Sequence, residues 1–230
     1  MLIFVPKTIG YPVKIDKNSY GTIASVWAVF AGLLVCLTVF VHNLYILLPI
    51  ALLLSAFMFF VLWFHRVPAR EVPDPSAQAV TSVADGKVVI IRKVFEPECL
   101  KQECIQVSVY MDFFDVHSNF WPMTGTVFYY KYHPGHYFLA FLPKASERNE
   151  HSSTGIRNAH GEIFFKQIAG TFARRIVCYS REGDRVEKGK QCGIIKFGSR
   201  IDVFLPLDAE LKVKVGDRAR ACETVLAVLK

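Results

Sequence analysis

Hydrophobic residues are distributed very unevenly along this chain. No charged residue occurs between Lys17 and Arg66, and nearly every position of that stretch is apolar. One membrane-spanning helix needs about 20 consecutive apolar residues, so the stretch is long enough for two. His42-Asn43 interrupts it, which predicts one helix over about 22–41 and a second over 44–64, joined as a tight hairpin. Apolar residues on every face of both segments favour lipid surroundings over the core of a soluble protein.

Basic residues flank the predicted hairpin on both sides, namely Lys7, Lys14, Lys17, Arg66 and Arg70. Cytoplasmic flanks of membrane helices carry an excess of Lys and Arg, so both ends of the hairpin are expected to face the cytoplasm. The apolar segment is too long and too bulky for a cleaved signal peptide. We therefore interpret residues 1–66 as an anchor in the cell membrane, with the rest of the chain on the cytoplasmic side.

The pattern changes after the hairpin. Residues 67–79 contain three prolines and scattered charges and are expected to form an extended linker. From residue 80 onward, short runs of β-branched and aromatic residues alternate with turn residues, which is typical of strands. These runs are 86–95, 104–111, 125–132, 136–142, 162–169, 175–179, 193–198, 201–206 and 224–229. The pattern predicts a mainly β domain over 80–230, with one or two short helices, most plausibly near 169–175.

A weak internal repeat suggests the kind of β fold. Residues 182–195 and 215–228 share a Gly-Asp-Arg turn followed by a small or β-branched residue. Such turns are common in barrel-like sandwiches built from repeated hairpins, including lipoyl and biotinyl carrier domains. The repeat indicates a barrel-sandwich fold and says little about chemistry.

Composition and net charge indicate what kind of partner the protein binds. The chain has 230 residues, is 52% hydrophobic and carries a formal net charge of +7, which suits one good-sized core, a membrane segment and an anionic partner. The membrane segment favours an acidic lipid surface over nucleic acid as that partner. The cysteines stand at 36, 99, 104, 178, 192 and 222 without zinc-type spacing. They are predicted to be reduced thiols, mostly buried.

Three local features could carry chemistry: Asp85-Gly86, the pair Asp115 and His117, and Gly198-Ser199. Each has a structural alternative, respectively an Asp-Gly turn, a histidine hydrogen-bonded in the core, and a hairpin turn between two strands. Together they suggest a serine nucleophile, a base and an orienting carboxylate. The G-x-S-x-G motif of hydrolases is absent. The serine instead directly follows a glycine, which leaves the preceding carbonyl uncrowded for attack by the hydroxyl.

Several segments, taken in order, resemble the phosphatidylserine decarboxylase family in its short, archaeal-type branch. The segments are FHRVPAR (64–70), ADGKV (84–88), FFDVHSNFWPMTGTV (113–127) and IKFGSRIDVFLP (195–206). Each motif is weak by itself, but the ordered set behind a membrane hairpin is specific. The resemblance covers most of residues 60–206.

The resemblance implies a self-cleaving enzyme. Ser199 would attack the Gly198 carbonyl, and the resulting ester would break to leave residues 1–198, residues 199–230 and a pyruvoyl group at position 199. Asp85 and His117 occupy the positions of the aspartate and histidine that assist the serine in the family. The pyruvoyl group would then serve as the electron sink for decarboxylation of phosphatidylserine to the ethanolamine lipid, with His117 returning the proton. Neither a metal nor a separately bound organic cofactor is expected.

The chain departs from the family's longer bacterial members at two points. Phe114 stands where those members have a second histidine, so His117 would have to act in both stages. Arg200 follows the serine, and it either attracts the substrate carboxylate or phosphate or is a solvated surface residue. Lys131, His133 and His136 are weaker candidates for phosphate contact, and for them exposed positions on a strand edge are the favoured alternative.

Other interpretations stay open on the sequence alone. A membrane-tethered carrier or adaptor with a lipoyl-like barrel would need an exposed lysine, for which Lys144 is a faint candidate. A decarboxylase could also take a serine ether lipid, because the lipid tails lie away from the reacting carbon. We further expect the aromatic-rich stretch 110–141, with Trp121, to rest against the lipid headgroups.

Overall fold

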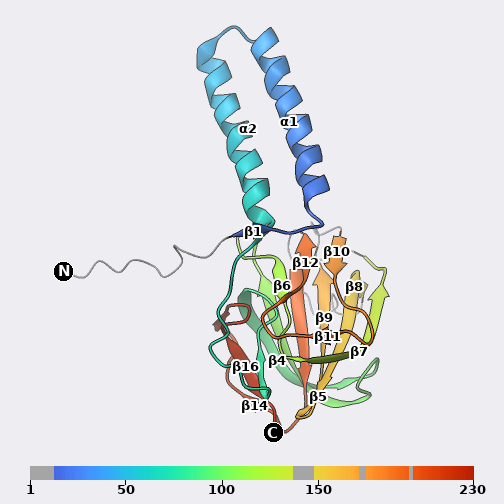
Figure 1. The fold of residues 1–230 in the computed structure, drawn as a ribbon. Coiled ribbons are helices and arrows are strands. Elements are labelled where there is room, and N and C mark those ends of the chain that lie inside the picture. Colours follow the sequence, from blue (N-terminus) through green and yellow to red (C-terminus); the bar gives the residue numbers. More distant parts are fainter. Residues whose placement is uncertain (1–12, 137–147, 171–174, 197–198) are drawn as a thin grey trace, which may run out of the picture. The chain divides into compact units, whose positions relative to one another are not determined.

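The fold is described from a computed structural model, which covers residues 13–136, 148–170, 175–196 and 199–230 (Figure 1). The chain divides into two compact units, Met1–Ala69 and Arg70–Lys230. We describe the first as the anchor unit and the second as the β unit, each by itself.

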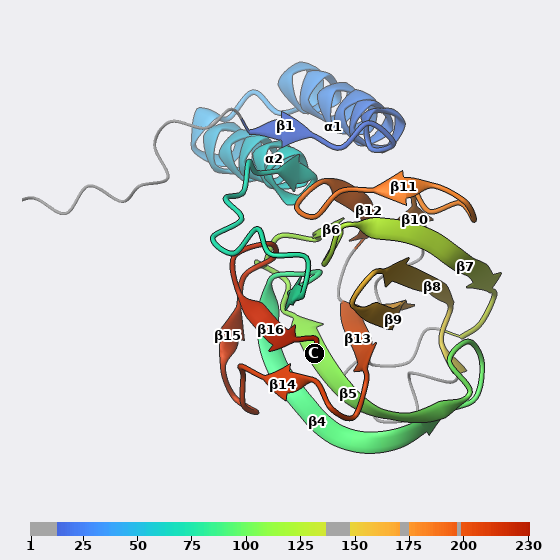
Figure 2. The same ribbon diagram turned by 60° about the horizontal axis from the view of Figure 1, so that its bottom comes forward.

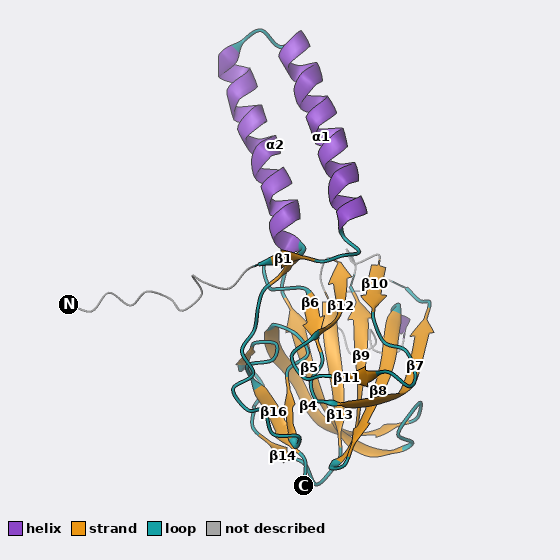
Figure 3. Ribbon diagram, in the orientation of Figure 1, coloured by secondary structure: helices purple, strands orange, loops and turns teal. Residues whose placement is uncertain are grey.

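The anchor unit contains the two predicted helices, α1 (Tyr20–Phe40) and α2 (Leu44–Phe64), drawn in purple in Figure 3. Each has 21 residues, with mean hydropathies of 2.4 and 2.6, and both are long and apolar enough to cross a membrane. At a rise of about 1.5 Å per residue, each matches a hydrocarbon core of about 30 Å. Phe30 stacks on Phe57 between the helices, with ring centroids 4.9 Å apart. The predicted helical hairpin is confirmed.

Local contacts close both ends of the hairpin. The side chain of Asn43 caps α2 by accepting a hydrogen bond from the Tyr45 amide at 2.9 Å. At the other end, β1 (Lys14–Ile15) pairs with β2 (Arg66–Val67). The Arg66 guanidinium lies 3.4 Å from the ring centroid of Trp63, an arrangement that suits a membrane interface.

The β unit consists of strands that form three sheets. Among the described residues, the largest sheet has the order β11-β7-β8-β9-β13-β5-β4-β15, with antiparallel neighbours, and two smaller sheets have the orders β10-β12-β6 and β14-β16-β3. Figure 2 shows how strongly the large sheet curls. The strands are β3 (Ala79–Thr81), β4 (Gly86–Glu96), β5 (Gln102–Met111), β6 (Ser118–Phe120), β7 (Gly125–His133), β8 (His151–Asn158), β9 (Gly161–Ala169), β10 (Arg175–Cys178), β11 (Arg185–Val186), β12 (Gln191–Lys196), β13 (Ser199–Leu205), β14 (Glu210–Leu211), β15 (Arg218–Ala219) and β16 (Val225–Val228).

Successive side chains of a strand point to opposite faces of the sheet, and this explains which residues form the core. On β13, Ile201, Val203 and Leu205 all join the main hydrophobic cluster, whereas Phe204 packs with Phe164 on the opposite face. We call the face of Ile201 and Val203 the inner face and the other the outer face. The predicted mainly β domain behind a helical hairpin is confirmed. The expected helix near 169–175 and the expected strand 136–142 fall largely outside the described residues.

The longest strand that the sequence analysis missed is β8. It reads HSSTGIRN and lies between β7 and β9 in the large sheet. Its polar side chains are buried because residues distant in the sequence supply their partners: the Ser152 hydroxyl donates to Gln167 Oε1 at 2.8 Å, and Thr154 and Ser180 share a hydrogen bond of 3.1 Å. A polar strand of this kind resembles a loop in sequence because its partners are distant.

The segment expected to be a linker packs on the β unit from Arg70 onward. The buried Lys188 ammonium donates to the Asp74 carbonyl at 3.1 Å and to the Ser76 carbonyl at 2.6 Å. These bonds fix the backbone around residues 74–76 to the domain that follows.

The Gly-Asp-Arg repeat of the sequence is also a structural repeat. One copy, the Asp85 repeat, combines residues 82–88 with 216–222, and the other, the Thr124 repeat, combines 121–127 with 183–189. Matching backbone hydrogen bonds of 2.8 to 3.0 Å join Gly216 N to Val88 O, Gly183 N to Val127 O, Cys222 N to Ser82 O, and Gly189 N to Trp121 O. β15 and β11 form the matching short edge strands.

Each repeat has a glycine at the start of its long strand. A Cβ atom at Gly86 would overlap the Tyr110 carbonyl oxygen, and one at Gly125 would overlap the Arg157 carbonyl oxygen. Close backbone approach therefore requires glycine at both positions. This requirement explains the glycine of the A-D-G motif without any role in chemistry.

Candidate active site

Ser199 is the first residue of β13, the strand that lies between β5 and β9. It is fully buried and pairs with Met111 on one side and Ala169 on the other. Its hydroxyl lies 3.5 Å from the Met111 sulfur. A thioether is a weak acceptor, so this contact orients the hydroxyl without binding it tightly.

The chain changes sheets immediately before Ser199. β12 pairs with β10 and β6, whereas β13 pairs with β5 and β9. Among the described residues, β12 and β13 belong to different sheets and share no hydrogen-bonded ladder, which contradicts the interpretation of Gly198-Ser199 as a hairpin turn. Gly198, the other residue of the predicted cleavage site, lies outside the described residues, as does Phe197.

His117 precedes β6 and is fully buried. Its backbone carbonyl accepts a hydrogen bond from the Ile195 amide at 3.2 Å, which ties it to the end of β12 that leads toward residue 198. Its Nδ1 lies 3.0 Å from the Asp115 carbonyl oxygen. Because a carbonyl can only accept, Nδ1 carries the proton, and Nε2 holds the lone pair of the neutral ring. A backbone carbonyl thus orients Nδ1 of this imidazole, where the sequence analysis expected a carboxylate to hold the ring.

Asp85 binds two groups through its two carboxylate oxygens. Oδ2 lies 2.5 Å from a terminal nitrogen of Arg70, and Oδ1 accepts the Ala221 amide hydrogen at 2.8 Å. The Arg70 side chain is only 4% exposed and also contacts Glu223 at 3.2 Å. A buried arginine between two carboxylates holds Asp85 in a fixed position. The FHRVPAR and ADGKV motifs therefore meet in space, a pairing that the sequence analysis missed.

Asp115 brings a second carboxyl group close to Asp85. Burial raises the pKa of Asp115, and the charges of Asp112 and Asp85 add to that rise, while the Asp112 backbone and Arg218 oppose it. Arg218 contacts the Asp115 carboxylate at 3.1 Å. The Asp85 repeat and the turn that holds His117 therefore share one electrostatic environment.

Buried amides form a polar wall on the inner face near Ser199. The Gln167 amide donates to Asn119 Oδ1 at 2.8 Å, and the Asn119 amide lies 3.8 Å from the Met111 sulfur that contacts Ser199. Sequence reasoning missed both residues. The signal was present, since Gln167 is a polar residue at an inward position of an alternating strand.

Comparisons with known proteins identify the family of the chain. The family model for phosphatidylserine decarboxylase matches residues 57–227. The chain belongs to this family. It is 44% identical over 168 residues to a phosphatidylserine decarboxylase proenzyme of Amoebophilus asiaticus, covering 73% of this chain and 74% of that protein. It is 38% identical over 221 residues to the proenzyme of the same name from Porphyromonas gingivalis, covering 94% and 99%. For that from Cytophaga hutchinsonii the identity is 39% over 217 residues, covering 94% and 98%.

In this phosphatidylserine decarboxylase family member, Arg200 is not a surface residue. It is fully buried, and its guanidinium binds the equally buried Asp202 carboxylate, with Nε to Oδ1 at 2.8 Å and a terminal nitrogen to Oδ2 at 3.1 Å. The surface alternative is therefore wrong. Successive residues of a strand point to opposite faces, so Arg200 lies on the outer face while Ser199 lies on the inner face. The ion pair compensates the cost of burying both charges.

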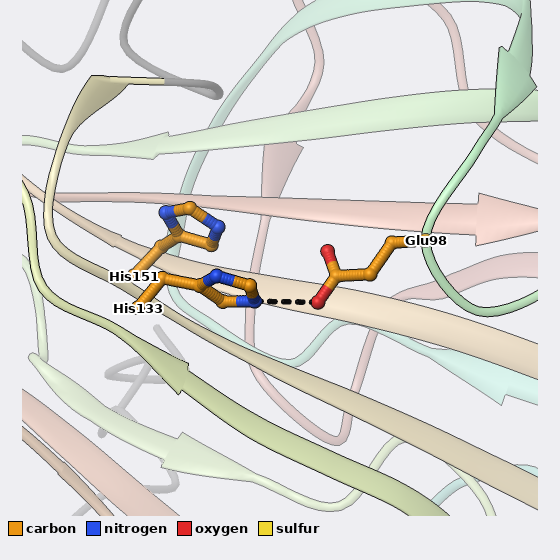
Figure 4. Close-up of side chains that lie close together, drawn as sticks. All are labelled: Glu98, His133 and His151. Carbon is orange, nitrogen blue, oxygen red and sulfur yellow. Dashed lines mark hydrogen bonds and ion pairs between the residues drawn. The ribbon is translucent and has the colours of Figure 1, made fainter.

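Among the weaker phosphate candidates, Lys131 and His133 belong to β7, which β8 and β9 separate from β13. Lys131 and His136 are exposed, which fits the favoured alternative for them. His133 is half-buried and belongs to a cluster with Glu98 and His151 (Figure 4). Its Nε2 lies 2.5 Å from Glu98 Oε1, and its ring stacks on that of His151 at a centroid distance of 4.3 Å.

Glu98 is the centre of this cluster. Besides His133, its carboxylate binds the Tyr129 hydroxyl at 3.1 Å, the Ser153 hydroxyl at 3.1 Å and the Lys166 ammonium at 2.7 Å. Burial acts to raise the pKa of Glu98, but the hydrogen bonds and the Lys166 charge outweigh it and lower the pKa to about 2. Glu98 thus fastens the turn between β4 and β5 to the outer face of the sheet.

Glu98, His133 and His151 are residue types that bind metal ions. One ligand atom from each lies within 4.8 Å of the others. Imidazole binds a metal through the lone pair in its ring plane. The two rings are stacked with only 13° between their planes, so their lone pairs do not converge on one point. The Lys166 ammonium already neutralises Glu98. The arrangement fits a hydrogen-bonded clamp better than a metal site.

Burial disfavours the thiolate form of several cysteines. All six are free, and burial raises the pKa of Cys99 to about 12, of Cys104 to about 11 and of Cys222 to about 12. These thiols remain protonated at neutral pH. Trp121 is likewise not available to lipid headgroups, because it is only 5% exposed and packs in the main core. That part of the interfacial hypothesis is wrong.

Proposed function

We propose that this chain cleaves itself between Gly198 and Ser199 and, with the resulting pyruvoyl group, decarboxylates phosphatidylserine to the ethanolamine lipid. The observation that carries the proposal is the position of Ser199. In a member of this family, the serine is buried at the start of a central strand, at the point where the chain passes from one sheet to another.

The cleavage chemistry uses the serine and its own preceding peptide bond. The Ser199 oxygen adds to the Gly198 carbonyl carbon, the C–N bond breaks, and the peptide becomes an ester while the nitrogen takes a proton. Loss of the Ser199 α-proton then expels the Gly198 carboxylate and leaves a dehydroalanine at 199. Addition of water and loss of ammonia convert this group to a pyruvoyl. Atoms balance with water as the sole co-reactant.

His117 is the proposed base for the first step. The Asp115 carbonyl fixes the proton on Nδ1, so Nε2 is the atom able to take the hydroxyl proton of Ser199. A positioned base of this kind contributes roughly 10²- to 10⁴-fold to a rate. The same nitrogen, once protonated, is our candidate for returning a proton to the substrate α-carbon. With Phe114 in place of a second histidine, one imidazole would serve both stages.

Asp85 is the proposed carboxylate of the site. The Arg70 contact and the Ala221 amide hold it in place, and its negative charge would stabilise a protonated His117. Arg70 acts here through Asp85, so we class it as a positioning residue. Arg70 is the first residue after the anchor unit in the sequence.

The pyruvoyl group fits the space that Ser199 occupies. It derives from the serine itself and has no more heavy atoms than the serine residue, so the small Ala169 and the flexible Met111 can remain beside it. When formed, the group supplies an electron sink for the carbon–carbon bond that breaks.

The two products of cleavage would stay together without a covalent link. Residues 199–230 contain β13, which is paired on both sides by β5 and β9, and also β15 and β16, which pair with β4 and β3. Ile201, Val203 and Leu205 are completely buried in the shared core. Each contributes about 1.5–3 kcal/mol of hydrophobic stabilisation, which favours a stable two-chain complex.

The anchor unit would keep the enzyme where its substrate is. A diacyl lipid hardly leaves the bilayer, because each buried methylene contributes about 0.8 kcal/mol. The two apolar helices support a membrane location, and the basic flanks support a cytoplasmic orientation of the β unit. An anionic serine lipid would suit the positive charge of the chain.

The structural repeat is typical of carrier barrels, so the fold alone fits the carrier alternative as well as the decarboxylase. Lys144, its candidate attachment site, lies outside the described residues. Intact mass separates the two ideas, because a carrier remains one chain and a decarboxylase becomes two.

The decisive test compares the parent with S199A, both purified as full chains in detergent. The parent should release carbon dioxide from serine lipids, and S199A should show neither cleavage nor activity. Retained activity in S199A would refute the mechanism. Running the assay with ester-linked and ether-linked serine lipids in parallel shows which tail class is accepted.

A further inference from the structure

Two exposed phenylalanines occupy the turn between β5 and His117. Phe113 is 44% exposed and Phe114 is 67% exposed, and their rings pack edge to face with centroids 5.6 Å apart. Met111, which contacts Ser199, lies just before this pair, and His117 lies just after it. The aromatic pair therefore lies on the segment that carries the candidate catalytic residues.

The turn is held in a defined shape. The Asp115 amide donates to the Asp112 carbonyl at 3.1 Å, and the Asp112 amide donates to the Asp115 carboxylate at 2.9 Å. Arg218 fixes the same carboxylate from β15. Two large apolar rings on a fixed turn cost solvation free energy in water, which indicates a surface that another apolar phase covers.

The charges beside the pair indicate which phase that is. Arg218 and Lys87 are register partners on β15 and β4, and both are exposed, as is Arg220. Asp112 and Asp115 are the acidic groups of the turn, and Arg218 neutralises Asp115. Aromatic rings flanked by Lys and Arg are typical of residues that enter the headgroup region of an anionic bilayer.

Another exposed phenylalanine provides a contrast. Phe95 is 58% exposed, but it lies at the opposite end of the β4–β5 hairpin, where its register partner is Glu103. Phe95 also has no second phenylalanine beside it in the chain, and Glu103 lies at the end of β5 away from Met111 and His117. Exposure of a phenylalanine is thus not enough, and its position along the hairpin distinguishes the two sites.

We infer that Phe113 and Phe114 insert into the headgroup layer of an anionic bilayer and bring the segment that carries Met111 and His117 to the lipid surface. This inference rests on the proposed function, because it gives the β unit a contact with the membrane that holds the substrate. The contact is separate from the helical hairpin. A serine headgroup could then reach the site while its tails remain in the bilayer.

Tryptophan quenching tests the inference directly. F114W and F113W, with F95W as the matched control, are made in the S199A background and reconstituted as full chains into vesicles of phosphatidylserine and phosphatidylcholine. Lipids brominated near the headgroup are added, and the emission of Trp27, Trp63 and Trp121 in the parent is subtracted. The added emission of F114W and F113W should be strongly quenched, and that of F95W should not.

The following results would refute parts of the inference. If neither F114W nor F113W is quenched, or if F95W is quenched equally, the insertion is refuted. Equal quenching in vesicles made of phosphatidylcholine alone would refute the requirement for anionic lipid. The quenching experiment uses S199A, which cannot cut itself, so absence of quenching does not bear on the proposed self-cleavage. Conversely, a parent protein that fails to cleave would not change the meaning of the quenching result.

Discussion

The Asp85 repeat and the Thr124 repeat have the same backbone and different side chains. In both, a side-chain oxygen at the end of the turn accepts an amide hydrogen from the facing segment: Asp85 from Ala221 at 2.8 Å, and Thr124 from Lys188 at 3.1 Å. A hydroxyl therefore suffices for this structural contact. The second oxygen of Asp85, which binds Arg70, has no counterpart at Thr124.

The segment 70–76 contacts both repeats, but it supplies a cation to one and carbonyl oxygens to the other. It offers the Arg70 cation to Asp85, and it offers the carbonyls of Asp74 and Ser76 to the Lys188 cation. The second contact is sufficient to fix the segment. The buried carboxylate of the first repeat is therefore an addition to the common framework, and it lies in the repeat that shares its electrostatic environment with the His117 turn.

The largest effect is expected when the Asp85 repeat is given the side chain of the other repeat. D85T should retain the acceptor for the Ala221 amide, and Arg70 keeps its contact with Glu223, so the variant should fold with some loss of stability. Self-cleavage should slow by about 100-fold or more, because the charge proposed to stabilise protonated His117 is lost. The fraction of cut chain is measured by intact mass over time.

The matched control for that change is T124A. It removes the corresponding acceptor in the other repeat, and it should cost about 1 kcal/mol of stability without slowing cleavage. Cleavage of D85T at the parent rate would mean that Asp85 serves only the turn.

Removing Arg70 should have the next largest effect. R70M leaves Asp85 and Glu223 without their cation, and breaking such a buried pair costs about 3–5 kcal/mol. The expected result is a large drop in the thermal midpoint together with slower cleavage. K188M, which removes only two bonds to carbonyls, should lower the midpoint less and leave cleavage intact. Equal slowing of cleavage in both variants would contradict the distinction between the repeats.

Both glycines belong to the common framework, but Gly86 also has a φ of +152°, which residues with a side chain rarely adopt. G86A and G125A each force a Cβ against a carbonyl oxygen, with an expected cost of about 1–3 kcal/mol. Thermal unfolding of both variants should shift to lower temperature, and the shift should be larger for G86A. A shift confined to G125A would contradict this explanation of the A-D-G glycine.

The smallest effect is expected outside both repeats, at Glu98. Its pKa is lowered to about 2, so its contribution to stability is present above the ordinary value near 4.5 and is lost as the pH falls toward 2. E98Q should flatten the dependence of the thermal midpoint on pH within that window while cleavage at neutral pH continues. An unchanged slope would show that Glu98 does not hold the outer face.

Much of the fold follows from sequence because its determinants are local. The two helices are fixed by uninterrupted apolarity, and β4, β5 and β13 by alternation of β-branched residues. β8 could not be predicted, because Ser152 and Thr154 form their side-chain hydrogen bonds with residues distant in the sequence, Gln167 and Ser180.

Prediction of the site was limited in the same way, because contacts between residues distant in the sequence could not be foreseen. The residue types predicted a nucleophile, a base and a carboxylate at Ser199, His117 and Asp85, and the resemblance assigned their roles. Burial of Arg200 depends on a strand that is covered on both faces, although Asp202 two positions later was a readable hint that both point the same way. The Arg70–Asp85 contact joins motifs whose proximity only the folded chain reveals.

The central claim is that Ser199 cuts the backbone before itself, and the intact mass of the purified full-length protein tests it most directly. The account predicts two chains, residues 1–198 and residues 199–230, with a ketone in place of the amino terminus of the shorter one, and a single chain in S199A. A correctly folded parent that remains one unbroken chain with an ordinary serine at position 199 would contradict it.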